Sequence, residues 1–151
     1  MRLFLAGIMQ GSHLGSVLHN QSYRERLKRL LVEHLADAEV YDPLADHRNS
    51  LDYDNDQGRK VFFHHNQLCR EVDAVIAFVP EASMGTAVEM WEAYQHGRAV
   101  ITISPLAHNW AVRFLSHAIY RDEAAFESAL RQGEVASCIA EVQSRRAASN
   151  R

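Results

Sequence analysis

Cysteine and long apolar runs are scarce in this chain of 151 residues, and charge of neither sign dominates it. Its two cysteines, Cys69 and Cys138, do not have the spacing of metal ligands. A disulfide between them is one alternative, but the composition favours a reduced intracellular protein. A formal net charge of −3 gives no cationic field for a nucleic-acid polymer. The apolar run 3–9 is too short to span a membrane and no cleavage site is evident after it, so we expect a cytoplasmic protein without a membrane partner.

The apolar material that is present suffices for one buried core. Hydrophobic residues make up 47% and charged residues 23% of the chain, as in ordinary globular proteins. We expect a single domain over 1–142 and a polar, frayed tail over 143–151. The nine histidines form no recognised zinc spacing, and no metal or cofactor is expected.

Short apolar runs alternate with amphipathic segments along the chain. Strands are predicted at 3–8, 38–41, 74–79 and 99–103, with a weak fifth at 118–120. Helices are predicted at about 22–36, 57–71, 85–96, 109–117, after Asp122, and at 134–143; Gly97 is the expected C-cap glycine of the third. The alternation predicts an α/β fold: a doubly wound, five-stranded, mostly parallel sheet of flavodoxin or Rossmann type, flanked by helices.

In such a sheet, ligands bind beyond the carboxyl ends of the strands. Loop 9–20, turn 80–86 and loop 104–110 meet at that edge. Within them, the strand–turn–helix segment 79–94 is the most informative: Gly85 allows a ligand to approach the backbone, and Glu89 lies one turn into the helix. Two alternatives stay open. Thr86 to Glu89 also matches a capping box, and Ser83 could be only a turn or cap residue.

The stretch from Ser83 to Met90, followed by Ala93-Tyr94 and 97–100, resembles the signature of the nucleoside 2-deoxyribosyltransferase superfamily, which includes 2'-deoxynucleoside 5'-monophosphate N-glycosidases. Segments 4–12 and 73–77 resemble its first and third strands, so the resemblance covers about 2–120. It implies that Glu89 is a catalytic nucleophile that attacks the anomeric carbon and expels the base.

The resemblance also implies a substrate-binding set around Glu89. A serine at position 83, where the transferases have aspartate, favours a 5'-phosphorylated substrate. The expected substrate-binding residues come from the first loop, the turn before Glu89 and the loop after the fourth strand: Gly7, Ile8, Gln10, Gly11, Ser12, Ser83, Met84, Gly85, Asn109 and Trp110.

Several positions depart from the family or allow more than one interpretation. His65 stands near the place of an acidic residue on the second helix; it is either a catalytic acid for the leaving base or a packed core residue. Ile8 and Gln10 stand where the monophosphate glycosidases have serine and arginine, which leaves the substrate open. Trp110 either stacks on a base or anchors a dimer interface. The polar loop 44–58 either covers the site, ligates a metal or is a solvated acidic loop, and the last is favoured.

Three functions follow from these patterns. The first is an N-glycosidase acting on a nucleoside 5'-monophosphate through a glycosyl-Glu89 intermediate; the second is a deoxyribosyltransferase that exchanges bases. The third is a nucleotide-binding sensor without turnover, because the fold alone does not fix a function. The expected partners are a small nucleoside or nucleotide and, as in the family, a second copy of the chain in a homodimer, or a multiple of dimers, with a shared active site.

Overall fold

The computed structural model describes residues 1–10 and 18–149. Its centre is a five-stranded sheet in the order β2-β1-β3-β4-β5, in which every neighbouring pair is parallel. The strands are β1 (Arg2–Gly7), β2 (Glu39–Tyr41), β3 (Ala74–Phe78), β4 (Ala99–Ile103) and β5 (Ala118–Tyr120). The predicted doubly wound α/β fold is confirmed, including the weak fifth strand.

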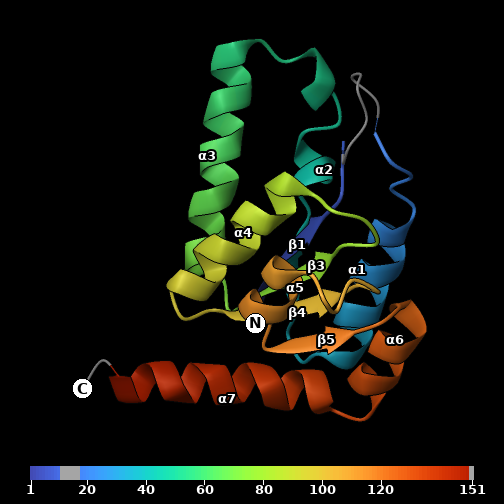
Figure 1. Cartoon of the computed structure of the whole chain (residues 1–151), viewed down its shortest axis with the longest axis vertical. Coiled ribbons are helices and arrows are strands. Elements are labelled where there is room, and N and C mark those ends of the chain that lie inside the picture. The colour runs from blue at the N-terminus through green and yellow to red at the C-terminus, as the bar shows by residue number, and fades with distance from the viewer. Residues whose placement is uncertain (11–17, 150–151) are drawn as a thin grey trace.

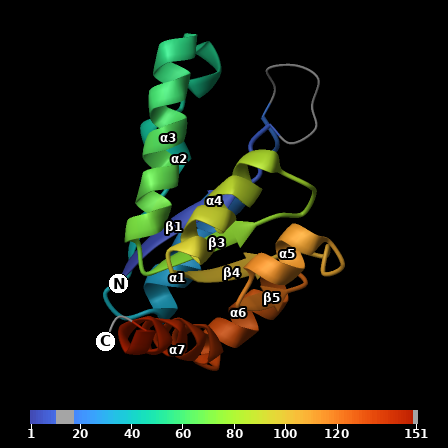
Figure 2. The same ribbon diagram turned by 60° about the vertical axis from the view of Figure 1, so that its left-hand side comes forward.

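Helices cover both faces of this sheet (Figures 1 and 2). One face packs against α1 (Tyr23–His34), α6 (Glu123–Arg131) and α7 (Glu134–Ser149). The other packs against α3 (Asn55–Glu71), α4 (Met84–Gln95) and α5 (Trp110–Leu115). The expected C-cap, Gly97, has a φ of 64°, a conformation that glycine adopts without a steric penalty.

The two-residue period of the strands divides the core between these faces. Leu3 and Leu5 of β1 point toward α1, whereas Phe4 and Ala6 point toward α3 and α4. All four are at most 1% exposed. Since burying one large apolar side chain contributes about 1.5–3 kcal/mol, both faces of β1 stabilise the fold.

The segment expected to be a polar loop at 44–58 contains ordered short helices instead. It forms α2 (Pro43–Asp46), the 3₁₀ turn η1 (Ser50–Asp52) and the start of α3. Two acidic residues of this region are helix caps: Asp42 caps α2, and Asp54 forms a capping box with Gln57 at α3. Figure 1 shows the first half of α3, in green, standing beyond the sheet beside α2.

The last helix is longer than predicted. Helix α7 continues to Ser149 rather than ending near 143, so residues 143–149 are helical and not a frayed tail. Val142 is buried, and the Glu141–Arg145 pair spans one helical turn on the exposed side. Composition suggested a tail because this last stretch shows only polar and small residues to solvent.

The chain reverses its direction of winding between β1 and β3, which lie side by side in the sheet although β2 separates them in sequence. Such a switch point leaves a crevice at the carboxyl ends of the two strands. Across the described residues, no helix combines the length and apolar character needed to cross a membrane.

Candidate active site

A cavity of about 400 Å³ lies at this switch point. Its walls come from the ends of β1, the turn before α4, and the projecting part formed by α2, η1 and α3. Seven of the predicted site residues line it: Gly7, Gln10, His65, Ser83, Met84, Gly85 and Glu89. The cavity therefore joins three segments that the sequence placed at one sheet edge.

Glu89 lies inside α4, not at its start. The helix begins after Ser83, whose side chain accepts a hydrogen bond from the backbone N–H of Thr86. The alternative in which Thr86 and Glu89 form a capping box is therefore wrong, because Thr86 occupies the third helical position. This leaves the Glu89 carboxyl facing the cavity.

The surroundings of Glu89 disfavour its charged form. Burial raises its pKa from 4.5 to about 8, and the positive charge of Arg24 opposes that rise. The charge of Glu89 in turn helps to raise the pKa of Tyr23 and of the Cys69 thiol, behind the larger effect of burial. Titratable groups perturbed in this way inside a cavity are typical of functional sites.

The next acidic residue of α4 has a different environment. Glu92 pairs with Arg70 of α3 at 2.8 Å and does not line the cavity. The two glutamates thus differ in role although they are one turn apart.

The turn before Glu89 offers groups suited to an anion. Ser83 is a cap residue, as one interpretation had it, and it lines the cavity as well. The backbone N–H groups of Met84 and Gly85, at the first two helical positions, have no acceptor within the helix. No atom would lie within 4 Å of a Cβ on Gly85, so this wall is open to a ligand.

His65 packs against the core and also lines the cavity. Its ring contacts Phe4 of the core edge-on. Its Nε2 atom lies 3.3 Å from the Tyr41 hydroxyl, and its ring centre lies 5.2 Å from that of His47. Burial, with the neighbouring His47 and His64, lowers its pKa from 6.5 to about 4, so at neutral pH His65 is an uncharged hydrogen-bonding group.

The first loop contributes less than expected. Ile8 is 1% exposed and does not line the cavity; its carbonyl accepts hydrogen bonds from Tyr23 and Gln21. Gln10 is exposed and lines the cavity. Gly11 and Ser12 lie outside the described residues.

Two other predicted residues lie apart from the cavity. Asn109 caps α5 and borders a smaller apolar hollow of about 170 Å³ that shares Ser83 and Met84 with the cavity. Trp110 is 77% exposed and packs edge-on against Phe114. Within one chain, neither side chain reaches the site of Glu89.

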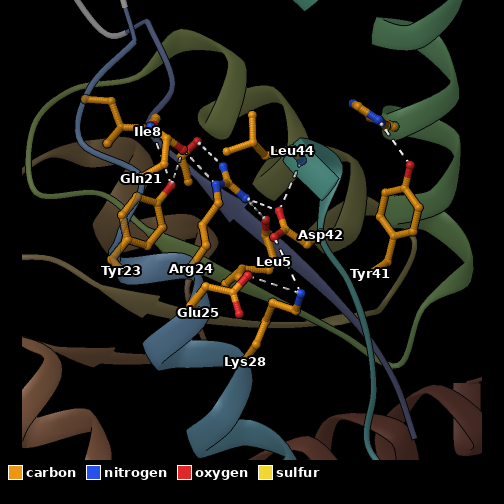
Figure 3. Close-up of polar contacts among 12 residues, drawn as sticks. Leu5, Ile8, Gln21, Tyr23, Arg24, Glu25, Lys28, Tyr41, Asp42 and Leu44 are labelled. Carbon is orange, nitrogen blue, oxygen red and sulfur yellow. Dashed lines mark hydrogen bonds and ion pairs between the residues drawn. The ribbon is translucent and has the colours of Figure 1, made fainter. Parts of the chain in front are cut away.

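The sequence interpretation missed a buried ion pair beneath the site. Arg24 and Asp42 are 2.9 Å apart and almost fully buried (Figure 3). One signal was available: Arg24 continues the apolar stripe of Leu27 and Leu31, so its side chain had to point inward. His47 lies in the polar loop that was expected either to cover the site or to be solvated, and it lines the cavity.

Both cysteines are free, so the possible disulfide is absent. Within residues 1–10 and 18–149, no three His, Cys, Asp or Glu side chains gather closely enough to hold a metal ion.

The fold and site define a class: doubly wound α/β proteins of flavodoxin-like strand order with a cavity at the switch point, here lined by a buried glutamate. No family model and no curated protein matches the chain. Solved structures of other proteins do match this chain. A 2-deoxyribosyltransferase from Bacillus psychrosaccharolyticus aligns with a TM-score of 0.64 at 16% identity, covering 84% of this chain and 90% of its own.

Two further structures share the fold. The Clostridium botulinum CMP N-glycosidase BcmB aligns with a TM-score of 0.51 at 24% identity, over 86% of this chain and 98% of its own. The flavoenzyme FerB, an NAD(P)H:(acceptor) oxidoreductase from Paracoccus denitrificans, aligns with a TM-score of 0.53 at 13% identity. The alignment covers 95% of this chain and 97% of FerB. All three structures are similar to this chain in fold.

Proposed function

We propose that this protein is an enzyme that cleaves the N-glycosidic bond of a nucleoside 5'-monophosphate, with Glu89 as nucleophile. The observation that carries the proposal is the carboxyl of Glu89 in a cavity of about 400 Å³, one helical turn beyond the free N–H groups at the start of α4. This arrangement suits a sugar between a nucleophile and an anion-binding turn. The CMP N-glycosidase among the structural neighbours agrees with it.

The reaction would proceed in two balanced steps. A Glu89 carboxylate oxygen forms a bond to the anomeric carbon while the bond to the base nitrogen breaks, and the base leaves with the electron pair and takes up a proton. Water then attacks the anomeric carbon of the ester, loses a proton and releases the Glu89 carboxylate and the sugar phosphate. Because the pKa of Glu89 is raised to about 8, the fraction of Glu89 in the nucleophilic carboxylate form increases as pH rises toward the alkaline side of neutrality.

The 5' phosphate would bind at the start of α4. The Ser83 hydroxyl and the N–H groups of Met84 and Gly85 are neutral donors, and the positive end of the helix dipole adds to them. These neutral groups can donate hydrogen bonds to a phosphate, whereas an aspartate at position 83 would repel it.

The base would bind at the other end of the cavity, against α3. Phe62, His47 and His65 line this end and present one phenyl and two imidazole rings. We propose that His65 orients the base through a hydrogen bond. A charged acid is less suitable, since its pKa of about 4 leaves little imidazolium at neutral pH.

Base release from a panel of nucleosides and nucleoside 5'-monophosphates, followed by chromatography, tests this function. Glu89→Gln and Glu89→Ala are expected to lose turnover by at least about 1,000-fold while remaining folded. Glu92→Gln is the matched control, because Glu92 lies one turn along the same helix and pairs with Arg70 outside the cavity. Near-wild-type turnover in both Glu89 variants would refute the nucleophile.

A deoxyribosyltransferase is the second candidate, because it would use the same intermediate and the transferase neighbour aligns with the highest TM-score of the three structures described. Adding a second free base to the assay separates the two: a transferase forms a new nucleoside, whereas a hydrolase continues to release sugar phosphate. Tight nucleotide binding without base release from any substrate would instead indicate a sensor.

We further propose that the protein is a homodimer that pairs through α4 and α5. Met84 is 86% exposed, Trp91 lies two turns along the same face, and Trp110 and Phe114 extend it onto α5. Large apolar side chains gathered in this way are typical of interfaces. Sedimentation is expected to show a dimer for the wild type and a monomer for Trp110→Glu combined with Phe114→Glu; a monomeric wild type would refute the pairing.

A further inference from the structure

Two histidine–tyrosine pairs lie next to each other at the α3 end of the cavity. His47 Nδ1 lies 2.9 Å from the Tyr53 hydroxyl oxygen. His65 Nε2 lies 3.3 Å from the Tyr41 hydroxyl oxygen (Figure 3). The centres of the two imidazole rings are 5.2 Å apart, at an interplanar angle of 62°. The four residues come from the end of β2, the two sides of η1 and the middle of α3, so only the folded chain brings them together.

Each pair leaves one imidazole nitrogen available to a ligand. Both imidazole rings line the cavity, whereas neither tyrosine is part of its lining. The nitrogen not bonded to tyrosine is Nε2 in His47 and Nδ1 in His65. Neither atom makes a hydrogen bond within the described part of the chain, and neither is among its buried polar atoms without a partner, so solvent reaches both. A ligand in the cavity can therefore form hydrogen bonds with these two nitrogens.

Aromatic packing holds the two pairs in place. The fully buried Phe4 ring stacks on Tyr41 with the centroids 5.6 Å apart, and it contacts His65 edge-on at 6.0 Å. The Tyr53 ring contacts His47 edge-on at 5.9 Å. Stacked and edge-on contacts at these distances are favourable. Side chains fixed in this way lose little further conformational entropy when they bind a ligand.

Charge is disfavoured at this end of the cavity. Burial and the neighbouring His47 and His64 lower the pKa of His65 to about 4, so its imidazole is uncharged at neutral pH. Burial and the negative charge of Asp46 raise the pKa of Tyr41, so its hydroxyl keeps its proton. Among the described residues, the lining of the cavity includes no lysine or arginine. Groups of this kind suit an uncharged heterocycle better than an anion.

We propose that Tyr41 and Tyr53 are positioning residues for base recognition: they orient the His65 and His47 rings, which together bind two neighbouring hydrogen-bonding groups at one edge of the base. In a pyrimidine these groups are N3 and the substituent at carbon 4, and in a purine they are N1 and the substituent at carbon 6. The hydrogen bond at one ring nitrogen fixes the ring and the role of the other nitrogen. The inference rests on the proposed function for the identity of the ligand, and it adds a second histidine and two tyrosines to that site.

The first test follows the imidazole nitrogens by NMR and needs no turnover. In protein labelled with ¹⁵N at histidine, ¹H–¹⁵N correlation spectra report the state of each ring nitrogen, and His47→Leu and His65→Leu identify the signals. Tyr41→Phe and Tyr53→Phe are each expected to shift the bonded nitrogen of their own histidine partner. Tyr94→Phe is the matched control, because its ring lies 5.7 Å from that of His117, outside the cavity.

The second test measures the two contacts to the base by calorimetry on Glu89→Gln, which is expected not to turn over substrate. CMP is compared with the analogue that lacks the amino group at carbon 4, and AMP with the analogue that lacks the amino group at carbon 6. Loss of this hydrogen bond is expected to weaken binding about 5-fold or more. With Tyr41→Phe and Tyr53→Phe added, the difference between nucleotide and analogue is expected to fall below about 2-fold. A general loosening of the site would instead weaken both ligands alike.

Three results overturn the inference: equal affinity for nucleotide and analogue, the same difference with and without the two tyrosine hydroxyls, or no binding of either CMP or AMP. The proposed function fails separately. A protein that binds CMP or AMP with the expected preference over the analogue, but releases no base from any substrate, refutes the enzyme and keeps the base-recognition site.

Discussion

A Cβ atom on Gly7 would lie 2.3 Å from the hydroxyl oxygen of Tyr23. Tyr23 cannot easily move away, because it is 3% exposed and its ring stacks on Phe78 with the centroids 4.2 Å apart. The absence of a side chain at position 7 therefore allows α1 to approach the end of β1, and with it the wall of the cavity.

Gly7→Ala is expected to lower the melting temperature and to reduce turnover, because the added methyl displaces either Tyr23 or the cavity wall. Adding Tyr23→Phe removes the closest clashing atom, and the double variant is expected to recover part of the loss. The Ile8 carbonyl stays satisfied there, since Gln21 also donates to it. Thermal melts and steady-state kinetics of the three variants check this; a Gly7→Ala protein as stable as wild type would contradict it.

Ser83 has two roles that can be separated by substitution. Aspartate is as good an N-cap as serine, whereas alanine loses the cap at a cost of about 1 kcal/mol. Ser83→Asp is therefore expected to keep the stability of α4 while shifting kcat/KM from nucleoside 5'-monophosphates toward unphosphorylated nucleosides. Ser83→Ala should lose stability without that reversal. An unchanged substrate preference in Ser83→Asp would remove Ser83 from the phosphate site.

A substitution at Gly85 is expected to stabilise the protein while weakening substrate binding. A Cβ here meets no protein atom within 4 Å, and alanine is the better helix former by about 0.5–1 kcal/mol. Gly85→Ala is therefore expected to raise the melting temperature slightly and to raise KM, because the methyl occupies the space where the substrate approaches the backbone. Unchanged KM would show that no ligand approaches this turn closely.

The fold could be predicted from the sequence because each central strand is a continuous apolar run. Residues 99–103 have the predicted bounds, and β3 ends one residue earlier than predicted. That Glu89 and Ser83 line one cavity could be predicted because both lie in one strand–turn–helix segment at the carboxyl edge of the sheet; their roles in a reaction stay a prediction. Of the alternatives for loop 44–58, the one in which it covers the site agrees with the structure, because four of its residues line the cavity: His47, Ser50, Leu51 and Gly58. Its short helices were not predicted, since the cap roles of Asp42 and Asp54 do not show in the composition.

The Arg24–Asp42 pair shows where prediction from sequence stops. The two residues are 18 positions apart, and only the packing of α1 against β1 brings them within 2.9 Å. The apolar stripe of α1 indicates that Arg24 points inward, but no pattern identifies its partner. Likewise, the raised pKa of Glu89 depends on its burial, and is opposed by Arg24 of α1, in an environment that exists only in the folded chain.

Burial of Glu89 should make the protein less stable as pH rises. The folded-state pKa of about 8 lies above the ordinary value of 4.5, so between these two values the folded state holds a proton that the unfolded state has lost. Unfolding is therefore favoured progressively as pH increases from about 4.5 to 8, and this penalty is fully present above pH 8. Glu89→Gln cannot ionise and is free of it.

Glu89→Gln is accordingly expected to melt close to wild type at pH 4.5 and about 3 °C or more above it at pH 8.5. Differential scanning calorimetry across this range measures the gap, with Glu92→Gln as control; that substitution breaks the exposed pair with Arg70 and should not stabilise the protein at high pH. A Glu89→Gln protein whose advantage does not grow with pH would show that the Glu89 carboxyl titrates normally. In that case it would be a solvated surface group, and the cavity would lack the desolvated carboxyl on which the proposed chemistry depends.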